Sequence, residues 1–100
     1  MGDVESDYES GLVLCLEEHR RLARLNPTHE LLKYGDVREE DEVFVYHEEH
    51  LDEAAKRFSK DGKPPRGIYA CAYMITRHFA ALKQAADEIE QNRPQTVQNS

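Results

Sequence analysis

The chain has 100 residues, of which 39% are hydrophobic and 33% are charged, and its formal net charge is −7 at pH 7. This length predicts a single domain with a thin core, because a domain of this size hides only about 60–65% of its unfolded surface. The composition argues against disorder throughout and against a membrane span, and the acidic excess argues against direct binding of nucleic acid through its phosphates.

The first predicted element is a helix over residues 4–25. Its apolar face consists of residues at helical spacing, namely Tyr8, Leu12, Cys15, Leu16, His19, Leu22 and Ala23. A short connector helix is expected to follow through residues 31–34, because Asn26 and Pro27 give a helix-start signal and Gly35 gives a stop.

A long third helix is predicted over residues 36–60. Four apolar residues recur there every seven positions: Val37, Phe44, Leu51 and Phe58. Acidic residues come early in this segment and basic residues late, as the helix dipole prefers. Residues 43–46 read Val-Phe-Val-Tyr, and such β-branched and aromatic side chains are also typical of a strand. A short strand near residues 43–46 is therefore the alternative.

The fourth predicted helix spans residues 66–91, after a stiff break at Pro64 and Pro65. Besides its main apolar face, this helix carries a second stripe on another side, formed by Tyr69, Tyr73, Thr76 and Ala80. Apolar groups on two sides indicate either a central helix of the bundle or a contact between two copies. The four stripe residues are thus the candidate oligomer interface.

Together these elements predict an all-α fold, a small irregular helical bundle of three main helices plus one short connector helix. Residues 1–92 are expected to form a single helical domain, and the polar tail at residues 93–100 is expected to be disordered. The motifs of the chain show no resemblance to a known family.

The charge of the chain is concentrated in an acidic segment, residues 36–53. This segment holds nine carboxylates and one arginine, a net charge of −8, so the other 82 residues together carry +1. On a helix, the carboxylates form two neighbouring columns that frame two exposed apolar residues. The candidate partner-binding residues are Asp41, Glu42, Val45, Tyr46, Glu48, Glu49, Asp52 and Glu53. Such a field speeds the encounter with a basic protein, although a solvated helix face without a partner explains it equally simply.

The chain contains no motif that names a reaction, so the protein is predicted not to be an enzyme. His47 and His50 are weak candidates for metal ligands, but the HExxH spacing is absent and no third ligand is fixed, so neither a metal nor a cofactor is expected. Cys15 and Cys71 lie in predicted helices and are expected to stay reduced, which indicates the cytoplasm, or the host cytoplasm for a viral protein.

Three functions are compatible with these features. The preferred hypothesis is a small acidic protein-binding module that masks the basic surface of a partner, such as a nuclease or a nucleic-acid-binding protein. Inhibitors, immunity or antitoxin proteins and phage anti-defence proteins act in this way. The alternative is a homodimeric structural or regulatory subunit assembled through the helix at residues 66–91. The third hypothesis is a histidine-based metal site at His47 and His50. No membrane partner is expected.

Overall fold

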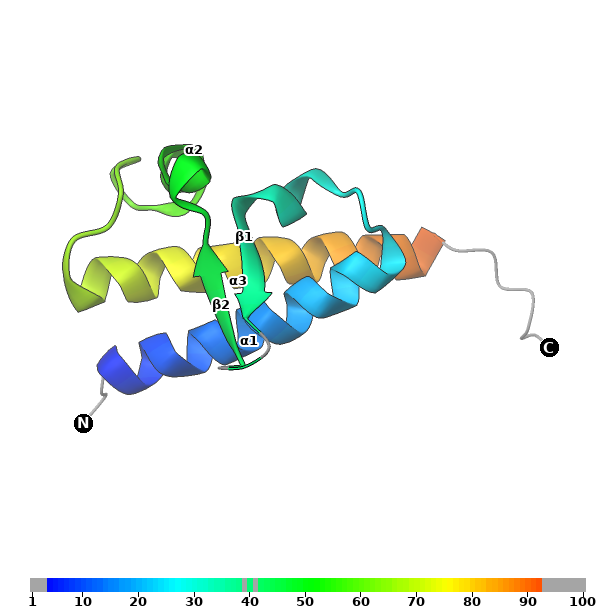
Figure 1. Ribbon diagram of the computed structural model, residues 1–100, viewed down its shortest axis with the longest axis horizontal. Helices are drawn as coiled ribbons and strands as arrows, with labels where there is room; N and C mark the ends of the chain where they lie inside the picture. The colour runs from blue at the N-terminus through cyan, green and yellow to red at the C-terminus, as the bar shows by residue number, and fades with distance from the viewer. Residues whose placement is uncertain (1–3, 39, 41, 93–100) are drawn as a thin grey trace.

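The computed structural model describes residues 4–38, 40 and 42–92, with side chains from residue 8 onward (Figure 1). The elements in chain order are α1 (Val4–Leu25), the 3₁₀-helix η1 (Glu30–Tyr34), β1 (Gly35–Arg38), β2 (Val43–Tyr46), the 3₁₀-helix η2 (Glu48–His50), α2 (Leu51–Phe58) and α3 (Gly67–Asn92). The predicted helices over residues 4–25 and 66–91 and the short helix before Gly35 are confirmed. The division into a domain over 1–92 and a tail over 93–100 stays a prediction, because residues 93–100 lie outside the described part.

The two long helices, α1 and α3, lie side by side and run in the same direction (Figure 1). A Cβ atom at Gly11 would lie only 2.7 Å from Ile75 Cγ2, so glycine at this position permits a close approach of the two helices. Beside this contact, the Cys15 thiol donates a hydrogen bond to the Ile75 carbonyl at 3.4 Å. Near the other end of the pair, the Arg21 guanidinium donates to Asp87 at 2.6 Å. Because the helices are parallel, the chain between them must return along their whole length.

The prediction of a third helix over residues 36–60 is wrong, and the all-α fold class is wrong with it. Strands β1 and β2 form an antiparallel hairpin in which Gly35 pairs with Tyr46 and Arg38 pairs with Val43. The strand given as the alternative near residues 43–46 is β2. A helix forms only afterwards, as η2 and the eight residues of α2. The fold is therefore largely helical with one small two-stranded sheet.

The seven-residue spacing that suggested a helix comes from packing and not from helical periodicity. Val37 lies in β1, Phe44 lies in β2, and Leu51 and Phe58 lie in α2, yet all four side chains belong to the core or pack against it. A helix would also place the acidic residues before Val43 next to one another, where like charges repel. An extended β2 is compatible with its β-branched and aromatic side chains, which favour a pleated, half-buried surface.

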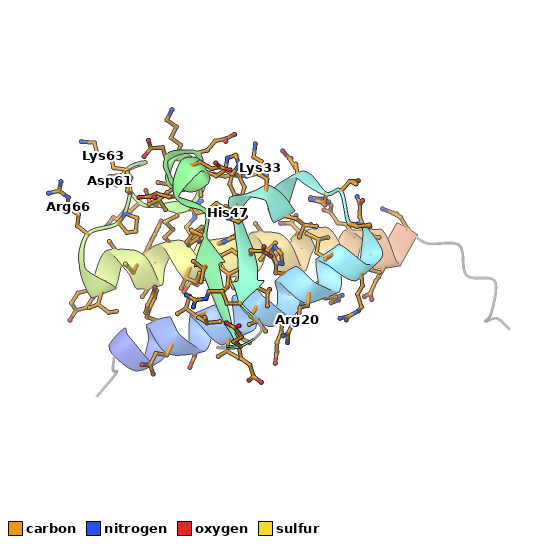
Figure 2. The ribbon with its side chains drawn as sticks, in the orientation of Figure 1. Arg20, Lys33, His47, Asp61, Lys63 and Arg66 are labelled. Carbon is orange, nitrogen blue, oxygen red and sulfur yellow. The ribbon has the colours of Figure 1, made fainter. Side chains whose placement is uncertain are left out.

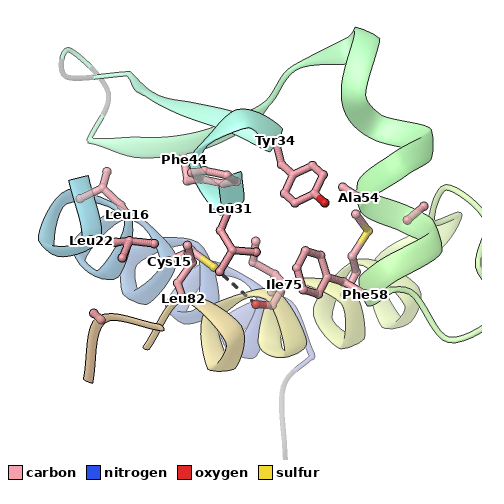
Figure 3. Packing of buried hydrophobic residues seen from close by; sticks show 13 residues of the cluster. Cys15, Leu16, Leu22, Leu31, Tyr34, Phe44, Ala54, Phe58, Ile75 and Leu82 are labelled. Carbon is pink, nitrogen blue, oxygen red and sulfur yellow. Dashed lines mark hydrogen bonds between the residues drawn. The ribbon is translucent and has the colours of Figure 1, made fainter. Parts of the chain in front are cut away.

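The core lies between the α1–α3 pair and the covering layer of the hairpin and α2 (Figure 3). Leu22, Ile75 and Leu82 are almost fully buried, and burying each such side chain contributes about 1.5–3 kcal/mol. The Phe44 ring attaches the hairpin to both long helices, since its centroid lies 5.4 Å from that of His19 and 5.2 Å from that of His78.

Candidate binding site

Of the predicted partner-binding residues, three exposed carboxylates lie on η2 and the first turn of α2. We call these three residues, Glu48, Glu49 and Asp52, the acidic surface. None of the three forms an ion pair with a lysine or arginine in the described part of the chain. Glu53 is different, because it accepts a hydrogen bond from Lys33 at 2.7 Å, and this bond lowers the pKa of the Glu53 carboxyl. Asp41 lies outside the described residues.

Glu42 does not join the acidic surface. It occupies the hairpin turn with a φ of 53°, in the left-handed region, and strand β2 separates it from Glu48. The four residues of β2 span about 13 Å at the rise of a strand. The two carboxylate columns expected on a helix are therefore not formed, because an extended strand interrupts them.

Val45 and Tyr46 point to opposite faces of β2, as successive strand residues do. Val45 is 37% exposed, as expected of an apolar contact residue. Tyr46 turns inward: its hydroxyl is hydrogen-bonded to His78 Nδ1 at 2.9 Å, and its ring stacks on the His78 ring. Burial raises the pKa of Tyr46. The expectation that Val45 and Tyr46 are both exposed and framed by the carboxylates is wrong for Tyr46, because the segment is a strand and not a helix.

The two weak metal-ligand candidates lie next to each other, with 6.2 Å between the ring centroids of His47 and His50. His47, Glu48 and Glu49 line a shallow hollow of about 430 Å³. Within residues 4–38, 40 and 42–92, however, no group of three or more histidine, cysteine or carboxylate side chains is arranged to hold a metal ion. The geometry gives the histidine pair no third ligand.

A larger groove, of about 1190 Å³, lies where the chain passes from α2 into α3, and we call it the basic groove. It is lined by Ser59, Lys60, Asp61, Lys63, Pro64, Pro65, Arg66, Tyr69, Ala70 and Tyr73. Figure 2 shows Lys63 and Arg66 extending from the body of the molecule at this end. Concave sites with a few polar groups are the usual places for ligands.

The wall of the basic groove is built by a loop with strong local constraints. Asp61 accepts hydrogen bonds from the backbone N–H of Lys63 at 3.0 Å and from the Ser59 hydroxyl at 3.4 Å. Gly62 has a φ of 73°, a conformation that other residues rarely adopt, and two prolines follow. The loop is thus held in one shape by short-range interactions, and its only carboxylate is engaged in holding that shape.

The opposite wall is formed by two tyrosines on α3. Tyr69 is 76% exposed and Tyr73 is 38% exposed, which is high for large aromatic side chains. Arg77 donates a hydrogen bond to the Tyr73 hydroxyl at 2.9 Å, and its guanidinium lies 5.6 Å from the centre of the Tyr73 ring. The remaining residues of the predicted oligomer interface, Thr76 and Ala80, are exposed as well. The stripe predicted on this helix therefore faces outward.

The basic groove contains three cations and one carboxylate, Asp61. Lys60, Lys63 and Arg66 each lack an ion-pair partner among the residues that the structure describes. This site was not predicted, because Lys60, Lys63 and the two prolines precede the predicted helix that carries Arg66 and the tyrosines. A usable signal was present, since Arg66, Tyr69, Tyr73 and Arg77 follow one another at three- and four-residue steps of a helix.

Two buried polar side chains of the core, Cys15 and His78, form hydrogen bonds within it. Burial raises the pKa of the Cys15 thiol to about 12, so the thiol stays protonated at neutral pH and is a weak nucleophile. Burial lowers the pKa of His78 to about 3, which makes its imidazole a very weak base. Both groups have structural partners, the Ile75 carbonyl and the Tyr46 hydroxyl.

Comparison with known proteins assigns no class to the chain. No family model matches it, and neither a curated protein nor a solved structure matches it. In the described part of the chain, none of the helices combines the length and the apolar character needed to span a membrane. The basic groove and the acidic surface are therefore the features that bear on function.

Proposed function

We propose that this protein is a protein-binding module and that its basic groove takes an acidic segment of a partner protein. One observation carries the proposal: three cations without ion-pair partners in the described residues line a concave site together with two exposed tyrosines. Tyrosine and arginine are the residues most enriched at the energetic centres of protein interfaces. A carboxylate entering the groove would meet Lys60, Lys63 and Arg66 without having to displace another anion.

The charge of the whole chain favours a short acidic segment over a nucleic acid as the occupant. A polynucleotide carries a phosphate at every residue, and the net charge of −7 repels it at long range. A peptide with a few carboxylates meets less of this repulsion, and its apolar side chains can cover Tyr69 and Tyr73. The rigid wall at Pro64 and Pro65 lowers the entropy that the site loses on binding.

The experiment is a titration of the full chain into a short dye-labelled peptide rich in glutamate and leucine, followed by fluorescence anisotropy at low and high salt. We expect Lys63→Glu with Arg66→Glu to weaken binding about tenfold or more, because reversed charges repel the peptide. Arg24→Glu, an exposed arginine at the far end of α1, is the matched control and should leave binding unchanged. Equal binding of the glutamate peptide by wild type and by the double variant would refute the proposal, as would single-stranded oligothymidylate binding as tightly as the peptide.

A second candidate function uses the acidic surface, which would mask the basic surface of a partner as an inhibitor or antitoxin does. The specific observation is that Glu48, Glu49 and Asp52 are exposed and have no lysine or arginine partner among the described side chains. Reversing all three to lysine should abolish capture of a lysine-rich peptide, whereas Glu17→Lys on α1 should not. Equal capture by the triple variant and by wild type would exclude this function. Reduced Cys15 and Cys71 are consistent with a cytoplasmic place of action.

A further inference from the structure

Along the exposed side of α2, negative charges come first and positive charges follow. A second copy in the opposite direction would therefore set opposite charges against each other. The acidic surface stands at its beginning, and three lysines follow along the chain: Lys56 on α2, and Lys60 and Lys63 in the loop after it. All three lysines are exposed and, like the acidic surface, form no lysine–carboxylate ion pair within the described residues. Along this segment, three exposed carboxylates are thus followed by three exposed ammonium groups.

We infer that two copies of this chain pair about a two-fold axis, with their α2 helices antiparallel and the acidic surface of each copy against the lysines of the other. This inference rests on the proposed function, because the basic groove would receive the acidic segment of a second copy. Parallel helices would set carboxylates against carboxylates and lysines against lysines, so the charges select the antiparallel arrangement. A two-fold contact of this kind is closed and stops at a dimer.

The dimensions of α2 suit this pairing. Eight residues span about 12 Å of helix, so Glu48 and Glu49, which precede it, are separated from Lys60 and Lys63, which follow it. Lys56 follows Asp52 at the i, i+4 spacing at which helix side chains are neighbours, yet these two residues form no ion pair with each other. Between two antiparallel copies, the acidic surface of each would face the lysines of the other.

Apolar groups are available at both ends to supply affinity. Val45, 37% exposed, precedes the acidic surface by three residues, and Tyr69 and Tyr73 stand beside the lysines in the basic groove. Antiparallel pairing brings Val45 of one copy to the same end as the tyrosines of the other. Exposed ion pairs alone contribute little, so the charges set the orientation while the apolar groups contribute most of the stability.

Charge exchange tests the inference with the full chain. One variant carries Lys60→Glu and Lys63→Glu, and the other carries Glu48→Lys and Glu49→Lys. Sedimentation velocity at low salt should show a dimer for wild type and at least tenfold weaker dimerisation for each variant alone, because like charges then face one another. An equimolar mixture of the two variants restores opposite charges at both contacts, so it should dimerise like wild type. Arg24→Glu and Glu17→Lys are matched single reversals elsewhere and should still dimerise.

The alternative outcomes are distinct. A wild type that stays monomeric at low salt and high concentration overturns the inference. So do variants that dimerise as well as wild type, or a mixture that fails to recover. Circular dichroism of each variant confirms that lost association is not lost folding. A monomeric wild type that still binds the glutamate-rich peptide contradicts only the dimer. The Glu48→Lys, Glu49→Lys variant leaves the basic groove unchanged and unoccupied, so its failure to bind the peptide, with wild type dimeric, contradicts only the proposed function.

Discussion

The helix pair α1–α3 and the middle segment over residues 35–66 are built by different rules. The pair consists of two long, regular helices. They are in contact near Gly11 and Ile75, and again near Arg21 and Asp87. The middle segment packs a hairpin, a 3₁₀-helix, a short helix and a loop into about a third of the chain. Local periodicity suffices for the first, whereas the second depends on contacts between distant residues.

The comparison also separates structure from function. The helix pair supplies most of the buried side chains, while the acidic surface and one wall of the basic groove belong to the middle segment. Short elements and loops on a rigid support are the usual carriers of binding residues, since they vary without disturbing the core. We therefore expect substitutions on the outer side of the middle segment to change the free energy of unfolding little, and substitutions on its inner side to lower it strongly.

The largest expected effect tests that contrast within β2. Phe44→Ala should lower the free energy of unfolding by about 3–5 kcal/mol, because Phe44 is buried between His19 and His78. Val45→Ala, one residue further, removes an exposed side chain and should cost about 0.5 kcal/mol or less. Urea denaturation of both variants measures the difference. Equal losses would contradict the alternation of the strand.

The next effect concerns His78, where the two regions meet. Burial lowers the pKa of His78 to about 3, and an unfolded histidine titrates near 6.5. Between these values the unfolded chain binds more protons than the folded one, so stability is fully present above pH 6.5 and falls as the pH is lowered. His78 alone should reduce the free energy of unfolding by about 2 kcal/mol at pH 5.

The slope of stability against pH distinguishes His78 from other groups. Burial also lowers the pKa of His19, so some of the slope should remain in His78→Gln. Ion pairs lower the pKa of the Glu53 and Asp87 carboxyls, so the stability that these two groups contribute is lost only near and below pH 4. Urea titrations between pH 7 and pH 5 therefore isolate the histidines. An identical slope in wild type and in His78→Gln would disprove the assignment.

The elements that sequence patterns predicted are those whose signals are local. The helix at residues 66–91 differs from α3 by one residue at each end, because its apolar spacing and the preceding prolines are visible in the sequence. A strand near residues 43–46 is the alternative that the sequence offers, but its pairing is not visible there, because the register joins Gly35 to Tyr46 across a turn. The wrong helix over this segment accounts for the wrong exposure of Tyr46 and for the wrong columns of acidic residues.

The candidate site was predictable to a similar extent. The outward stripe at Tyr69 and Tyr73 followed from a helix with apolar residues on two sides. The basic groove could not follow, because its shape depends on how the loop at Gly62 turns and how Arg77 holds Tyr73. Charge counting found the acidic surface but overestimated it, since neither the Lys33–Glu53 ion pair nor the strand between Glu42 and Glu48 is visible in the composition.

The smallest effect belongs to the helix pair, at its closest contact. Gly11→Ala places a methyl group 2.7 Å from Ile75 Cγ2, a distance that forces the stiff Ile75 side chain or the helix to move. Overpacking of this kind costs about 1–3 kcal/mol, and replacing glycine by alanine in a helix returns about 1 kcal/mol. We expect a net loss of about 1 kcal/mol, measured by urea denaturation.

A matched control separates the two contributions. Ser10→Ala lies one residue earlier on the exposed side of α1, so it should stabilise slightly through helix propensity alone. Ile75→Leu moves the branch point away from Cβ and removes the methyl that Gly11 faces. In the Ile75→Leu background, Gly11→Ala should therefore become neutral or stabilising, and the coupling in the double-mutant cycle measures the contact directly. A loss of the same size in both backgrounds would show that the close approach of α1 and α3 does not require glycine.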